Sequence, residues 1–312
     1  MLPVERVSRL PTRPATQRWL VDQLWADEGV GIVGGEPKCC KSFLALDLAV
    51  AVASGAPCLR RFTVPTKGRV LLFPAEDAHH VVQERIRGIC GEADVDFDTL
   101  DVHVITAPVL RLDRDSDCQA LRETVAELHP RLLILDPFVR VHRIDENAAG
   151  EVAPILAFLR ELQRELHVAV LVVHHARKGA AGSRAGQALR GSSEFHAWGD
   201  SNLYMRRHGD ALTMSVEHRA APSCPPVQLE LQGHRGGIAL HPLADTAPVQ
   251  PSAAPDPRDR ILDTLKAAAT PLSLRALRNA SHTRTQTLSD VLKALTAAGT
   301  IIHSAGGYRV AP

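Results

Sequence analysis

The octapeptide Gly-Glu-Pro-Lys-Cys-Cys-Lys-Ser at residues 35–42 restricts the possible folds of this chain strongly. It follows the phosphate-binding pattern G-x-x-x-x-G-K-[ST], except that Cys40 replaces the second glycine. Apolar runs at 30–33 and 43–52 flank it, which predicts a strand before the loop and a helix after it. Unpaired N–H groups and the helix dipole favour phosphate at such a helix N-terminus. A glycine-proline turn before an ordinary helix is the alternative, but the flanking runs favour phosphate binding.

Each position of this loop has an expected role toward ATP and Mg²⁺. Lys41 is expected to reach the β- and γ-phosphates, and the Ser42 hydroxyl to bind Mg²⁺. Because this pair is intact, the Cys40 side chain should point away from the nucleotide, into the contact between helix and sheet. A thiol at a helix N-terminus can be redox-sensitive, and a buried inert thiol is the alternative for Cys39 or Cys40. The residues expected to surround ATP are Gly35, Glu36, Pro37, Lys38, Cys39, Cys40, Lys41, Ser42 and Phe43.

Composition limits the class of protein. The 312 residues suffice for one large and one small domain, and 45% hydrophobic residues suffice for a packed core. A formal net charge of +1 means that any nucleic-acid site requires local clustering of basic residues. Six cysteines without C-x-x-C spacing argue against a zinc site or a disulfide framework. With no signal segment and no membrane-length apolar run, we expect a soluble cytoplasmic protein.

Strand-like and helix-like runs alternate from residue 30 to about 175, which is typical of a parallel sheet with crossover helices. After residue 198, shorter alternating runs predict an antiparallel extension of that sheet. The predicted fold class is therefore α/β, a mostly parallel sheet flanked by helices. Predicted strands are 30–33, 69–74, 101–106, 131–135, 168–173, 200–207, 211–218, 226–232 and 236–240, and predicted helices are 43–54, 78–91, 116–129 and 150–166.

A proline-rich segment predicts two domains. Residues 242–257 hold five prolines among small residues, which indicates a semi-extended linker. We therefore expect a large domain at 1–241 and a small one at 258–312.

The pattern of the small domain, three helices followed by a hairpin, resembles a winged helix-turn-helix. It holds eight Lys/Arg against three Asp/Glu, so its local charge is positive. Contact with duplex DNA through Arg284, Thr285, Gln286 and Arg309 is one interpretation, and a module for protein contacts is the other.

Acidic residues end two of the predicted strands. Asp136 closes the buried run 132–135 and is expected to hold Mg²⁺ together with Ser42. Glu76 follows the second strand and is expected to act as the general base toward water. Asp77, beside it, suits a helix N-cap better.

Two adjacent histidines, His174 and His175, end the fifth predicted strand. Adjacent residues of a strand point to opposite faces, so at most one ring can approach the γ-phosphate. We assign that role to His174. A zinc site is not supported, because the pair has no nearby Cys, His or carboxylate partners.

The order of these motifs resembles that of the RecA-like ATPases, most closely the RepA branch of hexameric plasmid-replication helicases. The likeness rests on the phosphate loop, Ala-Glu-Asp at 75–77, Leu-Asp-Pro at 135–137, His-His-Ala-Arg-Lys at 174–178 and Arg-Gly-Ser-Ser at 190–193. It covers about residues 16–240. The resemblance implies a RecA-like core that assembles as a homo-oligomer, a hexameric ring, with ATP between subunits.

The resemblance also implies an arginine finger, a basic residue on a late strand that reaches the ATP of the neighbouring subunit. Arg219 occupies the matching place in this sequence, and Arg206 and Arg207 are second choices. A solvated strand end is the alternative for all three.

Residues 176–190 contain four basic residues and no acidic one. The resemblance implies that a loop at this place faces the central channel and holds single-stranded DNA. Lys178, Arg184 and Arg190 are then the candidate phosphate contacts, independent of base sequence because the segment has no aromatic residue for stacking. A surface loop without DNA contacts is the alternative.

These features predict a DNA-dependent ATPase in replication, recombination or mobile-element maintenance, with helicase action as one form of it. An ATP-switched DNA-binding regulator or loader is the alternative, since both functions need the same ATP site. A small-molecule kinase is disfavoured, because the basic segment follows the fifth strand and a DNA-type domain comes after it.

Overall fold

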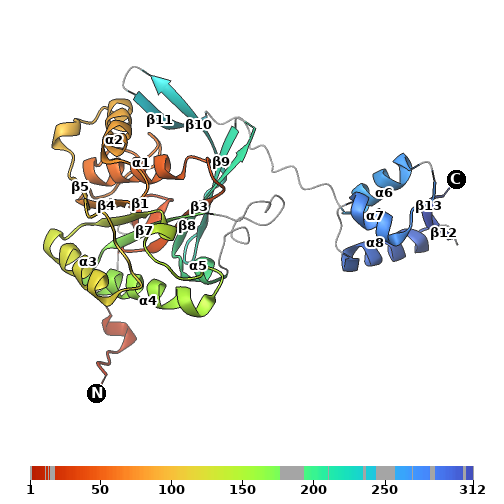
Figure 1. The fold of residues 1–312 in the computed structure, drawn as a ribbon, viewed down its shortest axis with the longest axis horizontal. Coiled ribbons are helices and arrows are strands. Elements are labelled where there is room, and N and C mark those ends of the chain that lie inside the picture. Colours follow the sequence, from red (N-terminus) through yellow and green to blue (C-terminus); the bar gives the residue numbers. More distant parts are fainter. Residues whose placement is uncertain are drawn as a thin grey trace. The chain divides into compact units, whose positions relative to one another are not determined.

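The computed structural model describes residues 2–10, 12, 14, 18–175, 193–209, 211–234, 237–243, 257–268, 270–281, 285–304 and 307–311. The chain divides into two compact units, Met1–Thr246 and Ala247–Pro312, each described by itself (Figure 1). Lys178, Arg184, Arg190 and Arg284 lie outside the described residues, as does most of the expected linker. Within the described ranges, no helix is long and apolar enough to cross a bilayer.

A nine-stranded sheet forms the centre of the larger unit, in the order β11-β10-β9-β8-β3-β7-β6-β4-β5. The strands from β8 to β5 in this order run parallel, and β9, β10 and β11 continue the sheet antiparallel. Their bounds are β3 (Val30–Gly35), β4 (Val70–Pro74), β5 (Val102–Val104), β6 (Leu132–Asp136), β7 (Ala169–His175), β8 (Ser201–His208), β9 (Ala211–His218), β10 (Val227–His234) and β11 (Gly237–Pro242).

Helices cover both faces of this sheet (Figure 1). One face, here named the α1 face, packs against α1 (Lys41–Ser54) and α2 (His79–Ala93). The opposite face, the α4 face, packs against α3 (Asp115–Leu128), α4 (Ala149–Leu166) and α5 (Ser193–Trp198).

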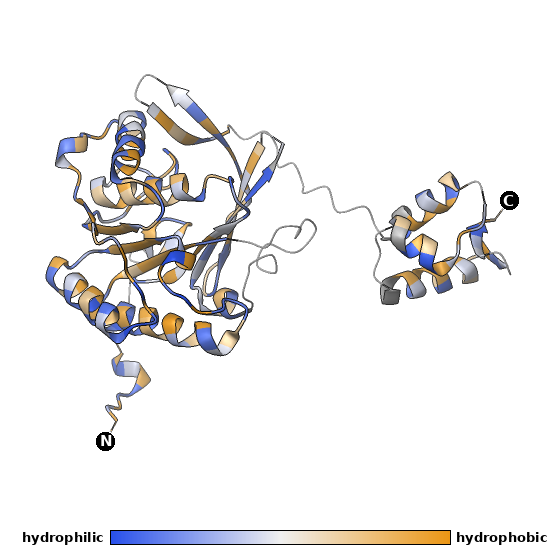
Figure 2. Cartoon of the chain, in the orientation of Figure 1, coloured by the Kyte–Doolittle hydropathy of each residue, from blue (hydrophilic) through white to orange (hydrophobic). Residues whose placement is uncertain are grey.

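Because both faces are buried, the central parallel strands β3, β4 and β6 consist almost entirely of apolar residues and glycine (Figure 2). Alternate residues of β6 serve the two cores: Leu132 and Ile134 lie on the α1 face, and Leu133 and Leu135 on the α4 face. This alternation decides which side chain at a strand end reaches which face.

Some details of the larger unit were not predicted. A small antiparallel hairpin, β1 (Trp19–Val21) and β2 (Trp25–Ala26), precedes the sheet. The insertion of β3 between β7 and β8 is also new, because the sequence shows strands but not their order.

The smaller unit has its own core. It consists of α6 (Pro257–Ala267), α7 (Leu274–Ser281), α8 (Thr285–Ala297) and the antiparallel pair β12 (Ile301–Ser304) and β13 (Gly307–Val310). The helices pack through apolar residues at helical spacing, among them Ile261 on α6 and Leu288, Leu292 and Leu295 on α8. A pair of backbone hydrogen bonds between Leu272 and Tyr308 ties the segment before α7 to β13.

Candidate nucleotide-binding site

The predicted phosphate loop joins β3 to the N-terminus of α1. Gly35 has a φ of +154°, and a Cβ there would lie 2.3 Å from the carbonyl oxygen of Met205 on β8, so the sheet contact requires glycine. Lys38 and Cys40 both adopt the left-handed conformation, with φ of 65° and 61°. Cys40 is the N-cap of α1, the position at which the motif normally has glycine.

Inside the loop, the Lys41 side chain is buried and directed back across the loop. Its Nζ donates a hydrogen bond of 2.8 Å to the carbonyl oxygen of Glu36 and lies 3.7 Å from Cys39 Sγ. The Cys39 thiol donates to the same carbonyl oxygen, at 2.8 Å. Burial raises the pKa of the Cys39 thiol, although Lys41 opposes the shift. Cys39 is therefore a buried, protonated thiol, which agrees with the inert alternative for this residue.

The Cys40 side chain is half-buried and packs against the core of the α1 face, in the direction that the sequence predicts. Arg207, on β8, approaches it from the side of the sheet. The Arg207 Nη2 lies 3.5 Å from Cys40 Sγ, and its Nε donates 3.1 Å to the carbonyl oxygen of Lys38. This contact lies within the same chain, and the second-choice role of Arg207 as a finger toward a neighbour stays a prediction.

Asp136 lies at the carboxyl end of β6 on the α1 face, where it accepts a hydrogen bond from the Ser42 side chain. Burial raises the pKa of Asp136 to about 6; the charges of Asp77 and Glu76 add to this rise, and Ser42 and Lys41 oppose it. The fold thus brings these five predicted residues, distant in the sequence, to one edge of the sheet.

The oxygen atoms of Ser42 and Asp136 fit a Mg²⁺ ion that is shared with phosphate. Mg²⁺ at nucleotide sites takes one or two protein ligands and completes its shell with phosphate oxygens and water. Within the described part of the chain there is no group of three or more His, Cys, Asp or Glu residues that could hold a metal ion by itself. The chemistry of this pair therefore suits a nucleotide-bound metal rather than a structural one.

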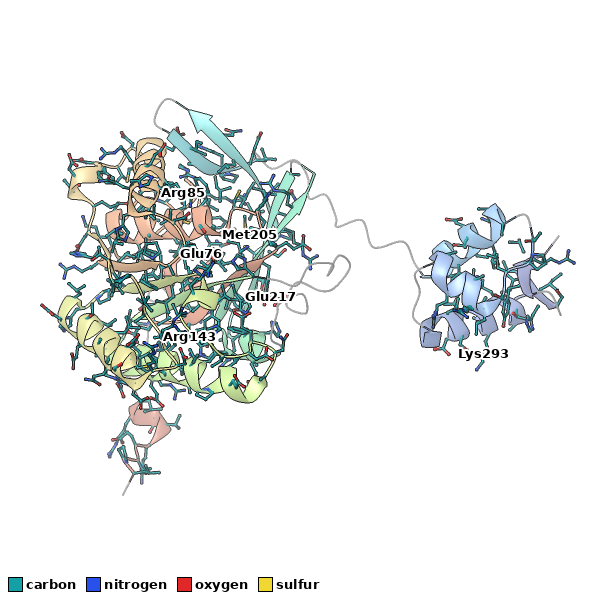
Figure 3. The ribbon with its side chains drawn as sticks, in the orientation of Figure 1. Glu76, Arg85, Arg143, Met205, Glu217 and Lys293 are labelled. Atoms are coloured by element: carbon teal, nitrogen blue, oxygen red, sulfur yellow. The ribbon has the colours of Figure 1, made fainter. Side chains whose placement is uncertain are left out.

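The two acidic residues after β4 each pair with an arginine. Arg140 Nε donates to Glu76 Oε1 at 2.7 Å, and both side chains are substantially exposed. Asp77 forms an ion pair with Arg85 of α2 (Figure 3 labels Glu76 and Arg85). The N-cap of α2 is Ala78, with no side-chain cap, so the N-cap interpretation of Asp77 is wrong.

Sequence reasoning missed Arg140, although it follows Asp136 by four positions at the same edge as Glu76. A cavity of about 470 Å³ opens beside this ion pair and can admit water to Glu76. It is lined by Phe73, Ala75, Glu76, Pro108, Val109, Arg111 and Arg140.

His174 is not at the phosphate loop. It is 1% exposed and lies on the α4 face, with ring centroids 5.9 Å from Phe138 and 4.2 Å from Phe195. Burial lowers its pKa to about 4, so the ring is neutral. This placement contradicts the predicted γ-phosphate contact of His174. Its neighbour His175 has the strand parity of the α1 face and pairs in register with Gly35.

Arg219 follows β9, at the end of the sheet opposite to the strand ends that carry the phosphate loop. His218 pairs with Ser201 at the start of β8, whereas the loop follows the end of the parallel strand β3. The Arg219 guanidinium donates to the carbonyl oxygen of Ala197 and lies 3.7 Å from Asp200. Arg219 is therefore distant from the phosphate loop of the same chain, and its role toward a neighbour stays a prediction.

The expected duplex-DNA contacts also stay predictions. Gln286 lies in α8, and Arg309 is an exposed residue of β13.

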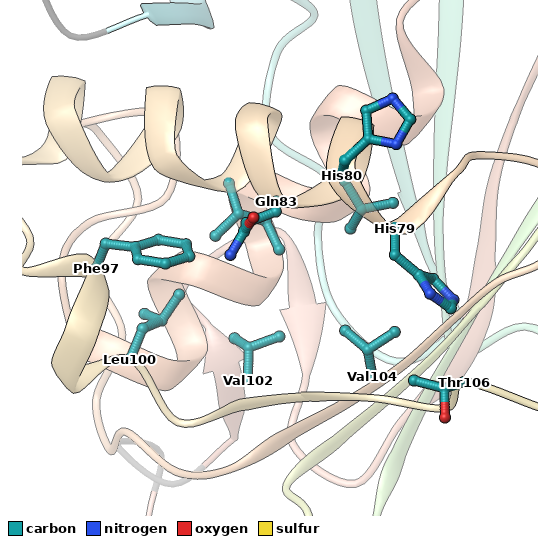
Figure 4. A pocket seen from close by; sticks show the side chains of 10 residues that line it. His79, His80, Gln83, Phe97, Leu100, Val102, Val104 and Thr106 are labelled. Carbon is teal, nitrogen blue, oxygen red and sulfur yellow. The ribbon is translucent and has the colours of Figure 1, made fainter.

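A second cavity, of about 400 Å³, lies between α2 and the edge strand β5 (Figure 4). Its wall is largely apolar, with Val82, Ile86, Phe97 and Leu100 among its residues. None of the predicted catalytic or phosphate-binding residues lines it, so it is distinct from the nucleotide site.

Comparison with known proteins agrees with this geometry. A family model described as an AAA domain matches residues 1–181. A structure of a DnaB-like replicative helicase and its interactions with primase is similar with a TM-score of 0.52 at 14% identity, covering 68% of this chain and 57% of that chain. The RadB recombinase gives a TM-score of 0.51 at 15% identity, covering 69% and 91%. This chain thus spans little more than half of the helicase chain, and the likeness confirms the predicted RecA-like fold.

Proposed function

The chain belongs to the AAA-domain family, and from this premise we propose that it is a DNA-dependent ATPase that works as a homo-oligomer of the RecA or RepA type. The observation that carries the proposal is the convergence of Lys41, Ser42, Glu76 and Asp136 at one edge of the sheet. These residues supply a phosphate-binding cation, two Mg²⁺ ligands and a general base, which is the set that phosphoryl transfer to water requires.

Each residue has one task in hydrolysis. The N-terminal N–H groups of α1 and the Lys41 ammonium bind the phosphates, and Ser42 and Asp136 hold the metal. A Mg²⁺ ion held there would neutralise charge on the phosphate oxygens. Glu76 accepts the proton of the attacking water, which reaches it from the cavity beside Arg140.

The ion pair between Arg140 and Glu76 restrains this base. While Arg140 Nε donates to Glu76 Oε1 at 2.7 Å, that oxygen is less available to an attacking water. Opening of the ion pair would make it available, so the rate of hydrolysis should respond to the contacts that Arg140 makes.

Assembly would add an arginine finger to this set. We assign Arg219 to the ATP site of a neighbouring subunit, in a ring expected to be hexameric. Mixing inactive Arg219→Ala with inactive Glu76→Gln should restore part of the hydrolysis, because some interfaces then hold both intact residues. A lack of rescue, with a monomer in the presence of ATP by sedimentation, would exclude this arrangement.

DNA binding is proposed at two places. Lys178, Arg184 and Arg190 are assigned to single-stranded DNA, and the small unit, as a winged helix, to duplex DNA through Arg284, Gln286 and Arg309. Support comes from the excess of basic residues in both segments, and from a replicative helicase and a recombinase among proteins of similar fold.

The test of function measures ATP hydrolysis with and without a single-stranded oligonucleotide, together with strand displacement. We expect single strands to stimulate wild type, and neutralisation of Lys178, Arg184 and Arg190 to abolish the stimulation. Arg309→Ala is the matched control, which should weaken duplex binding only. Stimulation without displacement would support the alternative, an ATP-switched regulator or loader. Hydrolysis that no DNA changes would contradict DNA dependence.

A further inference from the structure

Part of the phosphate-loop backbone adopts a left-handed conformation that its amino-acid sequence disfavours. Lys38 and Cys40 are both left-handed, and neither is glycine. A left-handed residue with a Cβ is disfavoured by a factor of about 5 to 150. The motif normally avoids this penalty with glycine at the position of Cys40. A contact from outside the loop that favours this conformation would offset part of the penalty.

Arg207 makes that contact. Its Nε donates 3.1 Å to the carbonyl oxygen of Lys38, and its Nη2 lies 3.5 Å from Cys40 Sγ, so one guanidinium touches both left-handed residues. Sulfur is a weak acceptor, so the bond to the Lys38 carbonyl is the stronger of the two. The fixed fork of a guanidinium can reach two such partners at once, whereas an ammonium is a single point charge.

The strand that carries Arg207 is paired on both sides within the sheet. β8 pairs with β3 on one side and with β9 on the other, and Met205 lies opposite Gly35 in the register (Figure 3 labels Met205). Arg207 itself pairs with Leu212 of β9. The backbone of Arg207 is thus held by the same sheet that holds the start of the loop, and its exposed side chain extends from there to Lys38 and Cys40.

We propose that Arg207 is a positioning residue that holds the phosphate loop in its binding conformation and compensates for the absent glycine at Cys40. The inference rests on the proposed ATPase function. Two other roles for Arg207, a direct bond to phosphate or a finger toward a neighbouring subunit, require no interaction with residue 40. The dependence of Arg207 on residue 40 therefore distinguishes the roles.

The test is a double-mutant cycle between Arg207→Ala and Cys40→Gly, with Mg²⁺-ADP affinity as the first readout. Arg207→Ala should weaken binding of Mg²⁺-ADP about 10-fold in the protein that has Cys40. In the Cys40→Gly background it should weaken binding at most about 2-fold, because glycine adopts the left-handed conformation without penalty. Arg207→Lys should resemble Arg207→Ala, because the positive charge alone cannot bridge the two partners. Equal losses of affinity in both backgrounds, or wild-type affinity in Arg207→Lys, would overturn the proposal.

Thermal unfolding without nucleotide is the second readout, and it does not depend on the proposed function. Arg207→Ala should lower the Tm by about 2–4 °C more beside Cys40 than beside glycine. If neither background binds nucleotide but this coupling appears, the ATPase proposal fails and the positioning role stands. If Cys40→Gly does not fold, Cys40→Asn replaces it, since Asn tolerates the left-handed region. Additive losses in Tm would refute the role.

Discussion

Asp136 and His174 lie at the carboxyl ends of two adjacent strands, β6 and β7, but on opposite faces of the sheet. Burial favours the neutral form of each, and it moves the pKa of Asp136 up to about 6 and that of His174 down to about 4. Their immediate contacts differ. Asp136 contacts Ser42 beside other charged groups, whereas His174 packs between two phenylalanine rings. A position at the carboxyl end of a parallel strand is therefore insufficient for a functional role. The face of the sheet to which the side chain points decides whether it reaches the site.

The largest expected difference between the two faces concerns ATP binding. Lys41→Ala removes the buried ammonium beside the loop and should weaken Mg²⁺-ATP binding by about 30-fold to 10³-fold, the usual range for a buried charged partner. His174→Gln, on the α4 face, should leave the affinity unchanged. Calorimetric titration of both variants checks this. Equal affinity in Lys41→Ala and wild type would place the phosphates elsewhere.

A second difference concerns the pH dependence of stability in Mg²⁺-free buffer. The pKa of Asp136 is raised in the folded state, so its contribution to stability is full below pH 4 and is lost as the pH rises toward 6. Asp136→Asn should therefore stabilise the protein at pH 7, on the order of 2–3 kcal/mol, and change little at pH 4. Urea unfolding at several pH values measures this.

His174 provides the control of opposite sign. Its lowered pKa means that its contribution to stability is lost as the pH falls from about 6.5 toward 4. His174→Gln should therefore lose less stability than wild type as the pH falls, and the substitution should have no such effect near pH 7. The same pH slope in both variants would refute the assignment of the two groups to different environments.

The smallest effect is expected at the rim of the site. Arg140 and Glu76 are 59% and 42% exposed, and exposed ion pairs contribute about 0.2–1 kcal/mol. Arg140→Ala should therefore raise the DNA-independent rate of hydrolysis by at most about 5-fold, because Glu76 is then released. Steady-state kinetics checks the direction, with Arg143→Ala as the control from the same segment. A large fall in rate would show that Arg140 assists the reaction directly.

The sequence predicted the parallel sheet and its phosphate loop because both depend on local patterns. Strands buried on two faces are continuous apolar runs, and the loop motif is contiguous. A hydrophobic strand that ends in a carboxylate is a weak signal by itself. The phosphate loop upstream made Asp136 a candidate metal ligand.

Three features could not be predicted in this way. The sequence does not show to which face of the sheet His174 points, because the run 168–173 is apolar throughout and shows no alternation. The contact of Arg207 with Cys40 depends on β8 pairing with β3, although the two residues are 167 positions apart. The partner of Glu76 also depends on the order of strands, which local patterns do not determine.

The most direct test of the account is the steady-state rate of Mg²⁺-ATP hydrolysis, measured side by side for wild type, Glu76→Gln and His174→Gln. If the reaction takes place on the α1 face, Glu76→Gln should bind ATP normally and lose about 10²- to 10⁴-fold in rate, the usual effect of removing a general base. His174→Gln should remain close to wild type. Wild-type turnover in Glu76→Gln, or an equally large loss in His174→Gln, would contradict the account.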